Sequence, residues 1–114
     1  MHLYHITERT TWEQAQLTGY YLPIAYHKDG FIHCSLENQV IKVANAFYRN
    51  ANDLVLIKID DSKLVSPVIM ENLEGNEELF PHLYGPLTLE AVIEVAPLCL
   101  NALGFFVMPV FTQR

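Results

Sequence analysis

The first third of the chain alternates short apolar runs with polar turns, which predicts a strand, a helix and an extended segment. Residues 3–6 read as a short strand of β-prone side chains. A helix follows, because Thr10 and Glu13 have the spacing of a capping box and Gly19 stands where a helix commonly ends. Residues 20–23 are predicted to be extended.

The next stretch predicts a loop, a strand and the clearest helix of the chain. Residues 24–30 are expected to form a loop closed by a glycine, and residues 31–34 a second strand. Ser35 is a good N-cap for a helix over 36–49. That helix is indicated by apolar residues at positions i, i+3, i+4 and i+7, namely Val40, Val43, Ala44 and Phe47.

The second half of the chain reads as strands separated by turns. Residues 54–59 form a strongly β-prone run, which is typical of a central strand. Residues 65–70 contain Pro67, which lacks a backbone donor and therefore favours an edge or irregular strand. An acidic loop is expected over 72–78, and two further strands over 92–98 and 105–110.

Two early helices and about six strands favour an α+β fold, because the two kinds of element do not alternate as they do in a doubly wound α/β sheet. The chain has 114 residues, of which 51% are hydrophobic, so residues 1–114 are expected to form a single domain with its own core. Cys34 and Cys99 lack the spacing of a zinc site and are expected to be buried, reduced thiols.

The charge distribution argues against nucleic acid as a partner. Seven basic and thirteen acidic residues give a net charge of −6, and the basic residues are scattered, so no nucleic-acid-binding surface is expected. The N-terminus lacks the pattern of a signal peptide, and the apolar stretches are too interrupted to span a bilayer, which predicts a cytoplasmic protein with no membrane segment. The acidic net charge does not exclude small phosphorylated ligands, because the backbone N–H groups at the start of a helix can bind them.

Two histidines on predicted strands are candidates for chemistry. Side chains alternate across a strand, so Ile32 and Cys34 are expected to face the core while His33 and Ser35 face the other way. If the first two strands are neighbours, His5 and His33 line one cavity, where their donors and acceptors suit a ribose diol, an amide or a metal. The alternative is that each histidine is a structural residue with satisfied hydrogen bonds.

The segment 77–85 is a second candidate, because titratable residues are embedded there among aromatic residues and prolines. Glu78 suits a general base or an acceptor for a ribose hydroxyl, and His82 suits an acid, a base or an orienting group. Glu71 ends an apolar strand and is placed to face the same cavity. The alternatives are an aromatic plug that closes one end of the sheet, with its charges exposed, and an exposed carboxylate at Glu71.

A metal site is a further alternative. His5, His33 and His82 together with Glu78 have the chemistry of a zinc or iron ligand set. No local pair has a ligand spacing such as H-x-H or H-E-x-x-H, so no metal is expected.

Two strings of the sequence are highly specific: residues 30–35 read G-F-I-H-C-S, and residues 80–86 read F-P-H-L-Y-G-P. With Tyr4-His5-Ile6-Thr7, Trp12, Gln39 and Glu71, they resemble the bacterial family known as domain of unknown function 952 (DUF952) over nearly the whole chain. That family is in turn distantly similar to the ADP-ribosyltransferase superfamily.

The resemblance implies a split, curved, mostly antiparallel sheet with two main helices, which clasps NAD in a cleft. In that superfamily, three strands each supply one residue of the site. The resemblance implies that His5 is the residue from the first strand and that His33, with Ser35, is the one from the second. Glu78 is then the carboxylate that comes late in the chain. Glu71 and Glu77 compete with Glu78, and His82 is a replacement for a carboxylate. The implied catalytic set is therefore His5, His33, Glu78 and His82, and the implied nucleotide-contacting set is His5, Ser35, Glu71 and Tyr84.

Four functional hypotheses follow. The first is a transferase or NAD glycohydrolase with NAD as its substrate, and the second is a non-catalytic module that binds a nucleotide-like ligand in the same cleft. The third is a metal-dependent hydrolase. The fourth is a partner-binding domain that uses the apolar tail 103–111, which is otherwise an integrated strand. A monomer or a weak homodimer is expected.

Overall fold

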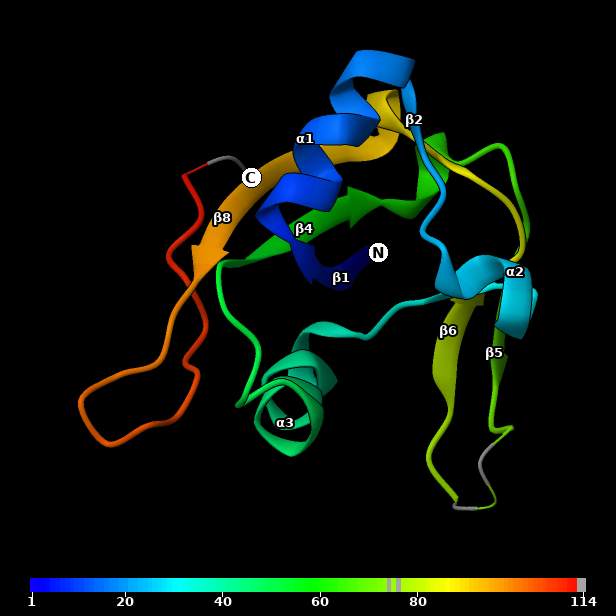
Figure 1. Cartoon of the computed structure of the whole chain (residues 1–114). Helices are drawn as coiled ribbons and strands as arrows, with labels where there is room; N and C mark the ends of the chain where they lie inside the picture. The colour runs from blue at the N-terminus through cyan, green and yellow to red at the C-terminus, as the bar shows by residue number, and fades with distance from the viewer. Residues whose placement is uncertain (74, 76, 113–114) are drawn as a thin grey trace.

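The computed structural model describes residues 1–73, 75 and 77–112, and within them three α-helices accompany eight strands that pair in antiparallel fashion (Figure 1). This arrangement confirms the α+β class, with one helix more than expected. The elements are β1 (His2–Glu8), α1 (Arg9–Thr18), β2 (Tyr20–Tyr21), α2 (Ala25–Asp29), β3 (Ile32–His33), α3 (Glu37–Phe47), β4 (Leu54–Asp60), β5 (Val68–Glu71), β6 (Phe80–Leu83), β7 (Leu87–Thr88) and β8 (Val92–Leu98). Two 3-10 turns, η1 (Asp61–Lys63) and η2 (Leu89–Ala91), join them.

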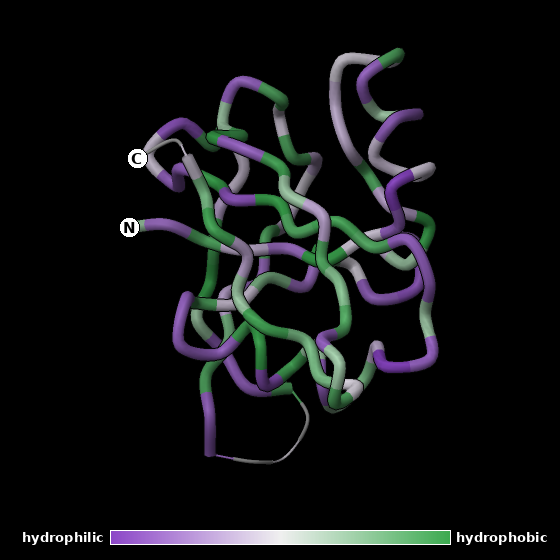
Figure 2. Tube along the Cα trace, turned by 90° about the vertical axis from the view of Figure 1, so that its left-hand side faces the viewer, coloured by the Kyte–Doolittle hydropathy of each residue, from purple (hydrophilic) through white to green (hydrophobic). Residues whose placement is uncertain are grey.

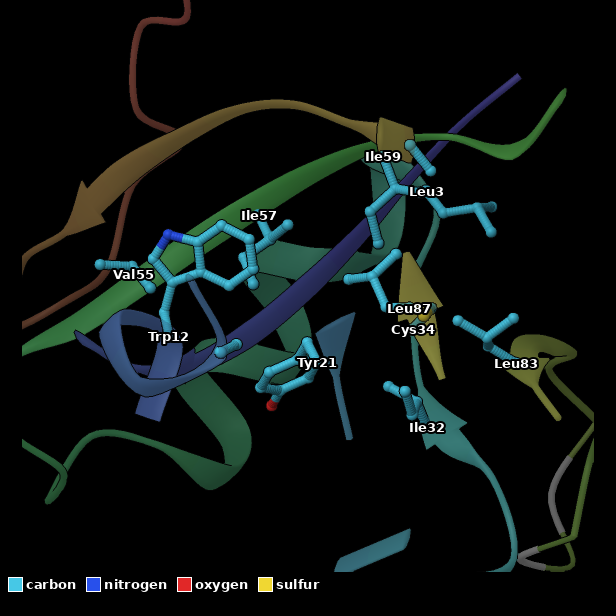
Figure 3. Close-up of a cluster of buried hydrophobic side chains, with 12 residues drawn as sticks. Leu3, Trp12, Tyr21, Ile32, Cys34, Val55, Ile57, Ile59, Leu83 and Leu87 are labelled. Atoms are coloured by element: carbon cyan, nitrogen blue, oxygen red, sulfur yellow. The ribbon is translucent and has the colours of Figure 1, made fainter. Parts of the chain in front are cut away.

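The longest strands form a sheet in the order β1-β4-β8, so the run over 54–59 is central as predicted. Side chains alternate across β4, and the sheet therefore has an apolar cluster on each face. On one face, Trp12 of α1 lies over Val55 and Ile57 (Figure 3). On the other face, Leu56 packs in the cluster that contains Val40 of α3. The two clusters fix α1 and α3 on opposite sides of the sheet.

A second, smaller sheet has the order β3-β6-β5 and carries the candidate residues. Strand β5 lies at its edge, as the proline at position 67 predicted. The backbone N–H groups of Tyr4 and Ser35 each donate to the other residue's carbonyl oxygen at 2.8 Å, which joins this sheet to β1. In Figure 1 the β5–β6 hairpin and α3 lie on the same side of the β1-β4-β8 sheet.

The first helix begins two residues earlier than the capping box predicted. Its N-cap is Glu8, which makes no side-chain capping bond. Arg9 instead ties this end to the loop before β4, because its backbone N–H donates to the carbonyl oxygen of Asp53 at 2.8 Å and its guanidinium bonds the Asp53 carboxylate. A contact between distant segments therefore replaces the local cap. Gly19 ends the helix with a φ of 90°, as predicted.

Two further local predictions are wrong. Residues 24–30 are not a loop, since Ala25–Asp29 form a helix that is too short to show an apolar period. Ser35 is not the cap of α3: its backbone pairs with Tyr4, and Leu36 occupies the N-cap position. The Gln39 side chain accepts the backbone N–H of Leu36 at 2.9 Å, so an amide at N3 caps this end in place of a hydroxyl at the N-cap.

The segment 105–110 is not a strand, although its apolar residues predicted one. It forms a single bridge between Leu100 and Phe106, and Phe106 is buried against α3. Asn45 of α3 holds this segment, because its side-chain amide accepts the Phe106 N–H at 2.8 Å and donates to the Phe106 carbonyl at 3.2 Å. A side-chain amide thus takes the place of a strand partner.

Hydrophilic residues interrupt the hydrophobic ones along the trace, and many of the outer turns are hydrophilic (Figure 2). Among the described residues, no helix has the length and apolar character needed to cross a bilayer.

Candidate functional site

A cleft of about 430 Å³ opens between one face of α3 and the β3-β6-β5 sheet. This volume lies within the range of roughly 300–1,000 Å³ that is typical of small-molecule sites. Five residues proposed from the sequence line it, namely His33, Ser35, Glu71, Glu78 and His82. The structure therefore brings together residues from β3, β5, β6 and the segments that follow and precede them.

His33 and His82 occupy directly paired positions on β3 and β6. Their ring centroids are 5.5 Å apart with the planes at 70°, so the rings meet edge to face. Phe31 stacks on the His82 ring, with centroids 3.9 Å apart and planes at 18°. The predicted alternation is confirmed here, because Ile32 and Cys34 belong to the core cluster while His33 and Ser35 line the cleft.

His82 is held by a carboxylate. Its Nδ1 lies 3.0 Å from Oε1 of Glu71, and the same oxygen accepts the hydroxyl proton of Tyr84. The Tyr84 bond, then the His82 bond, lowers the pKa of Glu71, and the carboxylate in turn raises the pKa of Tyr84. The His82 side chain is only 6% exposed, so the ring is fixed in place while its Nε2 has no protein partner among the described residues.

His33 forms a second pair of the same kind. Its Nε2 lies 3.0 Å from Oδ2 of Asp29, the last residue of α2. The His33 side chain is 46% exposed, which leaves its ring accessible from the cleft side. Two imidazoles, each oriented by a carboxylate, thus stand at one wall of the cleft.

Glu78 lies in the cleft but is neutralised by Lys42 of α3. The Lys42 ammonium is 2.8 and 2.9 Å from the two carboxylate oxygens, and the Gln39 amide donates to the same group at 3.2 Å. The bond from Lys42 is the main cause that lowers the pKa of Glu78. At neutral pH Glu78 is therefore an ionised, paired carboxylate, which favours a structural or ligand-orienting role over a proton donor.

His5 does not share the cleft with His33. It is 7% exposed and lies on the core side of β3, where its Nδ1–H donates to the carbonyl oxygen of His33 at 2.5 Å. Its Nε2 accepts the hydroxyl of Tyr21 at 2.8 Å, and the Tyr21 and Thr7 hydroxyl oxygens are 3.0 Å apart. Burial lowers the pKa of His5 to about 4, so the ring is neutral. Both ring nitrogens are satisfied by protein, which corrects the expectation of a shared cavity.

The remaining candidates differ in their placement. Tyr84 contacts Glu71 but is not among the cleft-lining residues, and Glu77 is exposed outside them. Cys34 borders the cleft with 3% exposure, and burial raises the pKa of its thiol to about 12, so it is a poor nucleophile. The three histidines of the metal hypothesis do not converge, and the described residues contain no group of three or more side chains placed to hold a metal ion.

Sequence reasoning missed three residues of the site. Asp29 pairs with His33 from four positions earlier, across the turn between the end of α2 and β3, so the pair depends on how that turn folds. Lys42 lies three positions after Gln39, and Phe47 is one of the apolar positions that predicted the helix, so the period gave no sign that either residue lines a cleft. Phe47, expected in the core, is 74% exposed and lines the cleft.

Comparisons with known proteins identify the family of the chain and structures that resemble it. The model of the family described as "Protein of unknown function (DUF952)" matches residues 6–95, and none of the curated proteins matches the chain. An X-ray structure of protein CC0527 from Caulobacter crescentus is 31% identical, with 94% of each chain covered and a TM-score of 0.83. The solution NMR structure of CC0527 is 32% identical, covering 91% of this chain and 90% of that one, with a TM-score of 0.79. The chain therefore belongs to the DUF952 family.

Proposed function

We propose that this chain binds NAD or an ADP-ribose-like nucleotide in the cleft between α3 and the β3-β6-β5 sheet, and transfers or hydrolyses ADP-ribose there. The observation that carries the proposal is the meeting of two histidine–carboxylate pairs, Asp29–His33 and Glu71–His82, at one wall of a ligand-sized cleft. Titratable residues that are oriented by a fixed partner inside a concave site are the usual signature of acid–base or binding chemistry.

The chemistry of the cleft wall suits a ribose and a flat ring. His33, Ser35 and Glu71 supply the donors and acceptors that a ribose diol needs. Apolar side chains of α3 on the opposite wall, among them Val43 and Phe47, suit the faces of a heterocycle. Both halves of a nucleoside therefore have a complementary surface.

In hydrolysis of NAD, the bond between ribose C1′ and the nicotinamide nitrogen breaks, and its electron pair leaves with neutral nicotinamide. A water oxygen then bonds to C1′, and the water proton passes to a base, for which His33 is proposed. The Glu71 carboxylate, held by His82 and Tyr84, is proposed to stabilise the positive charge that develops on the ribose. Transfer differs only in that an acceptor hydroxyl or amine takes the place of water.

A second candidate is a module that binds the nucleotide without turnover. It is favoured by the charge of the cleft, because among the described lining residues Lys42 is the one Lys or Arg side chain, and it is already bonded to Glu78. A pyrophosphate is commonly held by several cationic or backbone donors, so a cleft with so few retains a ligand better than it stabilises a transition state.

The test is a thermal-unfolding titration with NAD and with ADP-ribose, followed by chromatography for released nicotinamide. The proposal expects a rise in Tm that is lost in His33→Ala and kept in Leu17→Ala, whose side chain is 82% exposed on α1, outside the cleft. Released nicotinamide supports the enzyme, and a Tm shift without release supports the module. Equal Tm values with and without ligand would refute both.

A further inference from the structure

The apolar side of helix α3 is wider than the core covers, and its uncovered part lines the cleft. Val40 and Ala44 are fully buried against the β1-β4-β8 sheet. Val43, Ala46 and Phe47, at positions i, i+3 and i+4, line the cleft, and of these only Val43 also packs against that core cluster. A helix face that is turned away from the core is normally polar, so an apolar face on a cavity wall requires another explanation.

Phe47 is the most exposed part of that face. Its side chain is 74% exposed and makes no contribution to either core cluster. Leu73, in the segment after β5, also lines the cleft and is 60% exposed. Large apolar side chains that remain exposed in a concave site with polar residues nearby are typical of a surface that a ligand covers.

The cleft is thus divided into a polar part and an apolar part. His33, Ser35 and His82 belong to the β3–β6 wall, whereas Phe47 and its apolar neighbours belong to α3. The Lys42–Glu78 ion pair also lines the cleft. A hydrocarbon chain would desolvate these charges without replacing their hydrogen bonds to water, while a heterocycle has apolar faces and polar edges.

We infer that Phe47 stacks against the flat ring of the ligand, so that Phe47 selects ring-bearing nucleosides and nucleotides over sugar phosphates. This inference rests on the proposed function and names the part of the ligand that α3 recognises. Stacking of a base on an aromatic side chain contributes enough to change affinity by roughly five- to hundredfold when the ring is removed.

The experiment measures dissociation constants of AMP and ribose 5-phosphate by NMR titration of the full chain. Phe47→Ala and Phe47→Leu are expected to weaken AMP binding by roughly five- to hundredfold, whereas Phe47→Tyr keeps it because the ring remains. Ribose 5-phosphate is expected to bind all variants equally. Leu17→Ala is the matched control, since it also shortens an exposed apolar side chain but lies on α1.

The outcomes separate this inference from the proposed function. If AMP binds wild type and Phe47→Ala with the same constant, the stacking role is overturned while the nucleotide cleft stands. If neither AMP, NAD nor ADP-ribose binds wild type, the proposed function fails and this inference fails with it. Because Phe47 is largely exposed, an equal Tm for wild type and Phe47→Ala is expected and verifies that the variant is folded.

Discussion

His5 and His33 lie on opposite sides of one peptide segment: the His5 imidazole donates to the His33 carbonyl oxygen at 2.5 Å, while the His33 imidazole projects into the cleft. The two histidines are therefore in contact, yet their rings do not share a cavity. His5 holds the backbone of β3 from the core side, and His33 is presented to ligand by that same backbone. His5 is therefore a positioning residue, whereas His33 is the histidine that a ligand in the cleft can reach.

Replacement of the two histidines is expected to lower the stability of the chain by different amounts. His5→Ala removes a buried ring and leaves the Tyr21 hydroxyl without its acceptor, which is expected to lower the free energy of unfolding by about 2–4 kcal/mol. His33→Ala removes a half-exposed ring and is expected to cost no more than about 1 kcal/mol. Urea unfolding measures both, with His27→Ala as the control on the exposed surface of α2. A small effect of His5→Ala would contradict its assigned role.

The stability of the chain is expected to fall in acid because of His5. Burial lowers its pKa in the folded state from 6.5 to about 4. Between these two values the unfolded chain binds a proton that the folded chain does not, so stability is fully present above pH 6.5 and is lost as pH falls towards 4. The difference between the two pKa values corresponds to a loss of about 3 kcal/mol in the free energy of unfolding.

Urea unfolding of wild type and His5→Phe from pH 8 to pH 4 measures this effect. The variant has no proton to gain at this position, so its free energy of unfolding should change less steeply with pH over this interval. Identical slopes would show that His5 does not titrate as described.

Tyr84→Phe is expected to raise the pKa of Glu71. The hydroxyl of Tyr84 is the main cause that holds this pKa below its usual value, and the bond from His82 is the second. Titration of the side-chain carboxyl carbon by NMR measures the change, and Tyr20→Phe, on an exposed tyrosine of β2, is the control. If the pKa of Glu71 stays where it is in wild type, then Tyr84 does not stabilise the carboxylate.

One of the two thiols is expected to react with a thiol reagent in the folded protein. Cys99 is exposed, whereas Cys34 is buried and its pKa is raised to about 12 by that burial. Counting modified cysteines by mass spectrometry of wild type, Cys99→Ser and Cys34→Ser identifies the reactive residue. Fast modification in Cys99→Ser would show that the cleft admits reagent to Cys34.

The long elements of the fold were readable from the sequence, and the short ones were not. The runs at 54–59 and 92–98 are seven-residue strands in the structure, because continuous β-prone residues suit a central sheet. Helix α2 was not predicted, because five residues are too few to show the apolar periodicity of a helix. The start of α1 depends on Arg9 and Asp53, which are far apart in the chain, so no local signal reveals it.

Part of the candidate site was also predictable. Alternation across a strand correctly separated His33 and Ser35 from the core residues beside them. The expectation that His5 shares this cavity failed, because the same rule could not reveal that Tyr21 and the His33 carbonyl satisfy both of its ring nitrogens. Hydrogen bonds that depend on tertiary placement decide whether a histidine is structural or accessible, and residue order alone does not contain them.

The central claim is that the cleft between α3 and the β3-β6-β5 sheet is a nucleotide site, and the most direct test is an amide NMR titration with ADP-ribose. The claim predicts saturable shifts at the amides of residues 33–35, 42–47 and 71–73, which line or adjoin the cleft, and their loss in His33→Ala. Shifts confined to other surfaces, or none at millimolar ligand, would contradict it.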